Sequence, residues 1–173
     1  MSVPPIKKSW WVCDGLLAGP SPVQPESRAR LDKLLAYGMN SFVDLRDTKE
    51  EIDGFPEVRY DSLLPSGVEY KNFPILDGQA PARDEDTDRI VRYICERMES
   101  GKKVYVHCHG GHGRTGTIVA AFLVRGGFPP AGSILHINIL RKAACAELSD
   151  ILSPQTDIQM GAIHSYGRFL QKA

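Results

Sequence analysis

The sequence has no excess of charge of either sign. Its 173 residues include 21 basic and 21 acidic side chains, so the formal net charge is +0 at pH 7. A chain without net positive charge has no overall electrostatic attraction for nucleic acid or for an anionic membrane surface. We therefore expect no nucleic-acid partner, and any affinity for anions must come from a local group of residues.

Long hydrophobic runs are also missing. The longest uninterrupted apolar stretch, Ile118–Val124, is far shorter than the roughly 20 residues of a membrane-spanning helix. Met1–Lys8 lacks the apolar core of a signal peptide. We therefore expect no membrane insertion.

Cysteines are few and show no paired spacing. The four are Cys13, Cys95, Cys108 and Cys145. Scattered cysteines indicate a reducing compartment rather than a disulfide framework, which predicts a cytoplasmic protein. With 42% hydrophobic residues, the length fits one domain over residues 1–173. The sequence leaves the oligomeric state open, and we expect a monomer.

Segments typical of strands and of helices alternate along the chain. Short apolar stretches predict one or two strands in Trp10–Ala18 and strands over Ser41–Leu45, Val68–Phe73 and Val104–Val106. Apolar spacing predicts helices over Glu26–Tyr37, Asp84–Ser100, Thr115–Arg125, Ala131–Ala146 and Thr156–Leu170, with residues 46–67 mostly loop. This alternation predicts a single-domain α/β fold, with a central, mostly parallel sheet flanked by helices on both faces.

The stretch from His107 to Thr115 holds the most specific chemistry of the chain. Cys108 and Arg114 are separated by five residues, of which Gly110, Gly111 and Gly113 are glycines. Glycines allow positive φ angles, so successive backbone amides can turn inward and form an anion-binding nest. The predicted helix that follows adds its free N-terminal amides. The planar fork of Arg114 is suited to two oxygens of a phosphate.

The same surroundings act on the thiol of Cys108. Amides, the helix N-terminus and a guanidinium all favour a negative sulfur, and cysteines in such places titrate at roughly 3.5 to 7.5. We therefore expect a nucleophilic thiolate below a bound phosphate, in a nest formed by His109, Gly110, Gly111, His112, Gly113 and Arg114.

Two other interpretations of the loop fit less well. A nucleotide-binding P-loop needs Gly-Lys-Ser/Thr, and no lysine lies between His107 and Thr115. The histidines and Cys108 suggest zinc, but they share one short turn and no second ligand cluster follows. We therefore expect neither a metal nor another cofactor.

At this point the chain resembles a known family. His107-Cys108, five residues and Arg114-Thr115 match the signature of the cysteine-dependent protein tyrosine and dual-specificity phosphatases. Phe73–Pro81, which we call the acid segment, looks like the segment that carries their general acid, and Gln155–Gln159 looks like their glutamine motif. The resemblance covers about residues 10–170, and its acid segment is most similar to that of the small cyclin-dependent-kinase-associated phosphatases.

The resemblance implies a role for each matching residue. Cys108 would attack phosphorus, Arg114 would bind the phosphate, and Asp77 would protonate the leaving group. Thr115 would donate to the regenerated thiolate, Gln155 would orient the attacking water, and His107 and Gln159 would support the loop. This chemistry predicts a metal-independent phosphatase that acts on phosphotyrosine, and on phosphoserine or phosphothreonine, in proteins.

Several alternatives stay open. Asp84 and Asp86 are rival acids that can equally cap a helix, and Asp44 with Arg46 is either a second acid site or a structural pair. Another cysteine can form a protective disulfide with Cys108. The side chains of His109 and His112, with a reference pKa near ~6.5, can turn cationic beside a phosphate-rich ligand. An inositol phosphate or phosphoinositide phosphatase, or a phosphoprotein-binding module, therefore remains possible.

Overall fold

The computed structural model describes residues 3–23, 28–47, 49, 51–52, 55–56 and 59–172. A five-stranded sheet forms its centre, in the order β1-β2-β7-β3-β6. Its strands are β1 (Trp10–Cys13), β2 (Leu16–Gly19), β3 (Ser41–Arg46), β6 (Glu69–Ile75) and β7 (Val104–His107), and a separate hairpin pairs β4 (Glu51–Ile52) with β5 (Phe55–Pro56). Strands β2, β7, β3 and β6 run parallel, and β1 is antiparallel to β2.

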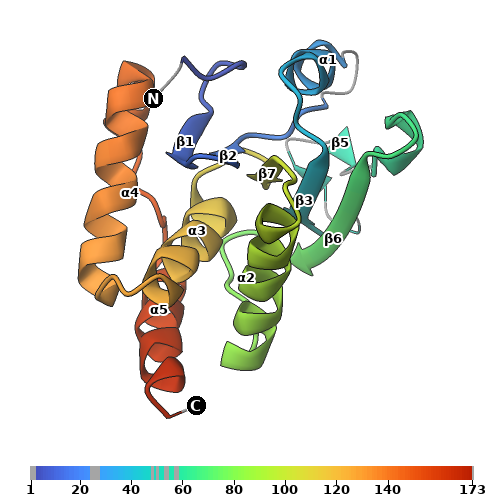
Figure 1. Cartoon of the computed structure of the whole chain (residues 1–173). Coiled ribbons are helices and arrows are strands. Elements are labelled where there is room, and N and C mark those ends of the chain that lie inside the picture. Colours follow the sequence, from blue (N-terminus) through green and yellow to red (C-terminus); the bar gives the residue numbers. More distant parts are fainter. Residues whose placement is uncertain are drawn as a thin grey trace.

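Helices cover both faces of this sheet (Figure 1). They are α1 (Ala29–Ala36), α2 (Asp84–Glu99), α3 (Gly113–Arg125), α4 (Pro130–Ala144) and α5 (Asp157–Leu170), with short 3-10 turns η1 (Asp61–Leu63) and η2 (Ala146–Leu148). The predicted α/β fold, with a mostly parallel sheet and helices on both faces, is confirmed.

The alternation of side chains along each strand divides the core into two layers. On β7, Val104 and Val106 face the layer that contains α2, α3, α4 and α5. Tyr105, between them, faces the smaller layer that contains α1. The strands are apolar on both sides because both of their faces are covered.

Most of the predicted element boundaries agree with the structure within a few residues. The first helix was predicted to start at Glu26, which lies outside the described residues, and α1 begins at Ala29. The predicted loop over residues 46–67 is only partly described, and it contains β4, β5 and η1.

The parallel strands determine where the candidate functional residues lie. Their carboxyl ends meet at one edge of the sheet, which is where ligands bind in open α/β folds. Cys108 follows β7 directly, and Asp77 comes two residues after the end of β6. Two segments that are far apart in the sequence therefore emerge side by side.

Two glycines of α5 should respond oppositely to the same substitution. A Cβ at Gly167 would lie 2.7 Å from Cγ of Pro130, whereas a Cβ at Gly161 would have nothing within 4 Å. Gly167→Ala should lower the free energy of unfolding by about 1–3 kcal/mol through overpacking. Gly161→Ala should raise it by up to about 1 kcal/mol through helix propensity. Urea denaturation of both variants measures this, and a stabilising Gly167→Ala would contradict the packing of α5 on the start of α4.

Candidate active site

A tight loop connects β7 to α3 and surrounds the sulfur of Cys108. We call residues 108–114 the signature loop. Gly111 has φ +79°, and its N–H donates to Cys108 Sγ at 3.3 Å. A Cβ at Gly111 would come within 2.6 Å of the carbonyl oxygen of Gly19. Only glycine satisfies both the backbone angle and the available space, and the result is an amide that points at the thiol.

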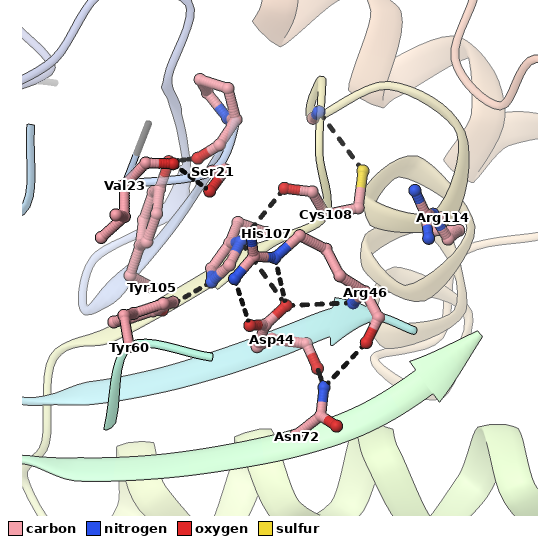
Figure 2. A network of polar contacts seen from close by, with 12 residues as sticks. Ser21, Val23, Asp44, Arg46, Tyr60, Asn72, Tyr105, His107, Cys108 and Arg114 are labelled. Atoms are coloured by element: carbon pink, nitrogen blue, oxygen red, sulfur yellow. Dashed lines mark hydrogen bonds and ion pairs between the residues drawn. The ribbon is translucent and has the colours of Figure 1, made fainter. Parts of the chain in front are cut away.

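Arg114 joins the signature loop to the acid segment. Its side chain is 1% exposed, and Nη1 donates to the backbone carbonyl of Ile75 at 2.9 Å. Nη2 lies 2.9 Å from Oδ1 of Asp77, whose side chain is 63% exposed. The structure therefore brings Asp77 to Arg114, which belongs to the same loop as Cys108. Cys108 is 3% exposed, and Figure 2 shows it together with Arg114.

The acid segment is fastened to the N-terminus of α5. Thr156 Oγ1 donates to the carbonyl of Gly78 at 2.9 Å, and Gln159 Nε2 donates to the carbonyl of Gln79 at 3.1 Å. Thr156 and Gln159 also form the capping box of α5. The same two side chains thus begin a helix and hold the residues that follow Asp77.

The predicted glutamines lie against the signature loop. A Cβ at Gly113 would come within 2.9 Å of Gln155 Oε1 and 2.7 Å of Gln159 Nε2. Gln159 is fully buried, and its Oε1 accepts from the backbone N–H of Gln155 at 2.9 Å. Gln155 is exposed, so its amide can reach both the loop and solvent. Thr115 is fully buried, and its hydroxyl has no hydrogen-bond partner in the described part of the chain.

The rival acids have other partners. Asp84 and Asp86 both lie in the first turn of α2. Asp84 accepts a hydrogen bond from Ser165, and Asp86 forms ion pairs with Arg83 and Arg89. Of the three candidate aspartates, Asp77 is therefore the one that faces Arg114.

The two histidines of the signature loop have different surroundings. His109 is exposed, and its carbonyl accepts from the N–H of Ser21 at 2.8 Å. Nδ1 of His112 lies 2.8 Å from Nη2 of Arg141. Burial, followed by the charges of Arg141 and Lys8, lowers the pKa of His112 to about 4. The lowered pKa favours a neutral His112 ring, and a cationic ring beside a phosphate-rich ligand stays a prediction.

Behind the signature loop, His107 belongs to a buried polar network (Figure 2). Its Nε2 lies 2.6 Å from Tyr60 Oη, and its Nδ1 lies 3.1 Å from the carbonyl of Cys108 and 3.9 Å from Asp44. Asp44 is fully buried and accepts from Arg46 through both oxygens, at 2.9 and 2.8 Å. These contacts favour the structural interpretation of the Asp44–Arg46 pair over a second acid site.

The charge of Asp44 depends on this network. Burial acts to raise the pKa of Asp44, but His107 and Arg46 outweigh it and hold the pKa below its usual value. Asp44 Oδ2 also accepts from Tyr70 Oη at 2.9 Å. Tyr60, Tyr70 and Arg141 were not identified from the sequence, because no local motif marks an aromatic or basic side chain whose partner is distant in the chain.

The other cysteines and the metal alternative can be checked in the described residues. All four cysteines are free, so the structure contains no disulfide to Cys108. Among the described residues, no group of three or more histidine, cysteine, aspartate or glutamate side chains is placed to hold a metal ion. No helix in the described ranges is long and apolar enough to cross a membrane.

Comparison with known families gives a match over most of the chain. Residues 7–159 match the family model described as PTP-SAK: Swiss Army Knife protein, DSP-PTPase phosphatase domain. "Putative tyrosine phosphatase 067L" of Invertebrate iridescent virus 3 is 33% identical over 118 residues, which cover 66% of this chain and 45% of the viral protein. "Protein tyrosine phosphatase domain-containing protein 1" of Mus musculus is 28% identical over 127 residues, or 67% of this chain and 17% of the mouse protein. The matches thus span less than half of each relative.

Solved structures share the fold. Tk-PTP in the active form is 26% identical with a TM-score of 0.68, covering 93% of this chain and 97% of that chain. PTPMT1 in complex with PI(5)P is 20% identical with a TM-score of 0.73, covering 96% and 98%. Kinase associated phosphatase with its catalytic cysteine replaced by serine is 19% identical with a TM-score of 0.66, covering 91% and 87%. The kinase-associated group is therefore one of several structural neighbours, and these comparisons do not single it out.

The buried network predicts a pH-dependent stability effect. Asp44→Asn leaves Arg46 without its counter-charge in the core, which should cost about 3–5 kcal/mol at pH 7. A depressed folded-state pKa stabilises the protein above the unfolded value, near ~3.9, and this stabilisation is lost as the pH falls. The difference between variant and wild type should therefore shrink below about pH 4.

Chemical denaturation at pH 7 and at lower pH measures this difference. Asp61→Asn is the control, because Asp61 pairs with Arg59 at 3.0 Å but both side chains are about half exposed. It should change stability little at either pH. A loss in Asp44→Asn that is constant with pH would contradict a charged Asp44.

Proposed function

The chain belongs to the dual-specificity and protein tyrosine phosphatase family, and from this premise we propose that it is a metal-independent protein phosphatase that works through a phosphocysteine intermediate. Its substrates are phosphotyrosine, and phosphoserine or phosphothreonine, in proteins. The observation that carries the proposal is the convergence of Cys108, Arg114 and Asp77, with Arg114 Nη2 2.9 Å from the Asp77 carboxylate.

The first chemical step is the transfer of the phosphoryl group to sulfur. The amides of residues 109–114 and the Arg114 fork bind the phosphate, and the Cys108 thiolate attacks phosphorus in line. Asp77, in its protonated form, donates to the departing oxygen as the phosphorus–oxygen bond breaks. Charge on the equatorial oxygens is stabilised by donors that are already oriented, so a metal ion is not required for this step.

The second step hydrolyses the intermediate. Asp77, now a carboxylate, accepts a proton from the water that attacks phosphorus, and Gln155 orients that water. The bond between phosphorus and sulfur breaks, and the Thr115 hydroxyl stabilises the returning thiolate. This buried hydroxyl has no hydrogen-bond partner among the described residues, which supports that role.

The substrate class follows from the distribution of charge. A polyphosphorylated inositol or a phosphoinositide needs several cations around the central phosphate, and the neutral His112 ring supplies none. The chain carries as many acidic as basic residues, which favours one phosphate per site on a protein. A catalytic thiolate requires a reducing compartment, so we place the activity in the cytoplasm.

The direct test of this function is hydrolysis of a chromogenic aryl phosphate by the purified chain. Cys108→Ser should abolish turnover while phosphate binding persists, because the hydroxyl is a poor nucleophile and the amide nest remains. Steady-state hydrolysis in Cys108→Ser near the wild-type rate would refute the nucleophile. A wild-type chain that binds phosphotyrosine peptides without turnover would support a binding module instead. Parallel kcat/KM values for phosphopeptides and inositol polyphosphates decide the substrate class.

Asp77→Asn should have two opposite effects. Loss of the general acid should lower kcat for a phenyl phosphate about 10²- to 10⁴-fold, and much less for an aryl phosphate with an acidic leaving group. Inorganic phosphate should bind more tightly, because the Asp77 carboxylate no longer competes for Arg114. Steady-state kinetics on both substrates and phosphate inhibition measure these effects. Asp84→Asn is the control, and a larger effect from it would assign the acid elsewhere.

A further inference from the structure

Arg141 on α4 is a buried cation whose partners are neutral. It has no exposed surface. Nη1 donates to the carbonyl of Ile151 at 2.7 Å and to Asn138 Oδ1 at 3.1 Å, and Nη2 donates to His112 Nδ1 at 2.8 Å. Nε has no hydrogen-bond partner among the described residues. Because an uncompensated buried charge is costly, its presence calls for an anion nearby.

Arg141 contacts the loop that contains Cys108. His112, which accepts from Arg141, comes directly after Gly111, whose N–H donates to Cys108 Sγ at 3.3 Å. Burial lowers the pKa of Arg141 to about 10, whereas negative charge on Cys108 acts in the opposite direction. A buried cation at this position would favour negative charge in the signature loop. A phosphate bound in the signature loop would bring further negative charge to the same place.

His112 links the guanidinium to the signature loop. Arginine only donates, so Nδ1 of His112 must be the unprotonated acceptor. The His112 carbonyl accepts from Ser153 Oγ at 2.7 Å and from the N–H of Gly116 at 3.1 Å. The residue is therefore held at its ring and at its carbonyl, directly before α3 begins. These contacts hold the residue that directly follows Gly111, whose N–H donates to Cys108 Sγ.

We propose that Arg141 is a positioning residue of the phosphatase site, which fixes the signature loop through His112 and adds a second buried positive charge behind the loop that contains Cys108. The inference rests on the proposed function, because it assigns a role toward the nucleophile and the phosphate of that reaction. The two contributions are separable. The charge requires only a cation, whereas the link to the loop requires an acceptor at the position of His112 Nδ1.

The contribution of the Arg141 charge is tested by alkylation of Cys108 at pH 6 with iodoacetamide, which is an uncharged reagent. Mass spectrometry of the Cys108 peptide measures the rate. Arg141→Met should slow this reaction about tenfold, because less of the sulfur is negative, and Arg141→Lys should stay within about twofold of wild type. Lys142→Met is the matched control, since it removes a cation from the neighbouring, exposed position of the same helix. Equal rates in Arg141→Met and wild type would overturn the charge contribution.

The link to the loop is tested by calorimetric binding of inorganic phosphate. His112→Leu removes the acceptor and should weaken binding about tenfold, whereas His112→Asn places an oxygen near the position of Nδ1 and should restore it to within about twofold. Phosphate affinity in His112→Leu equal to wild type would overturn the positioning role, as would failure of His112→Asn to restore it. If Arg141→Met does not fold, Arg141→Lys and the two His112 variants still test the proposal. Neither readout needs turnover, so a chain that hydrolyses nothing would fail the proposed function without affecting these results.

Discussion

The ion pair and hydrogen bond of one buried arginine connect the parts of this site. Arg114 lies in the first turn of α3. Its side chain donates to the carbonyl of Ile75 at the end of β6 and forms an ion pair with the carboxylate of Asp77. Its side chain thereby joins the loop after one strand to the segment after another. Because a guanidinium has a fixed planar geometry, these contacts determine the distance between the anion nest and the acid segment.

The polar groups around the signature loop divide into two sets with different electrostatic requirements. Behind the loop, Asp44 satisfies Arg46 and borders His107, so that charge is balanced within the core. On the other side, the hydrogen-bond partners of Arg141 in the described ranges are uncharged. The proposed phosphate site would benefit from this asymmetry, because donors and charges are in place before a ligand arrives.

The acid segment and the first turn of α5 depend on the same two side chains. Thr156 caps α5 and also binds the carbonyl of Gly78, and Gln159 combines a capping contact with a bond to Gln79. Fraying of the first turn of α5 would therefore release the residues beside Asp77. The cap of a helix and the position of the acid depend on the same hydrogen bonds.

The sequence alone determined the strand–loop–helix unit around Cys108 and Arg114 and the α/β fold, because local spacing and glycine content encode both. It left open the choice between Asp77 and the acids of α2, and it gave no partner for the His112 ring. Only the tertiary structure decided these contacts, since Asp77 meets Arg114 and His112 meets Arg141 only when distant segments pack together. Residues that meet through packing at the sheet edge are far apart in the sequence and leave no local pattern in it. A loop between two adjacent elements does leave such a pattern.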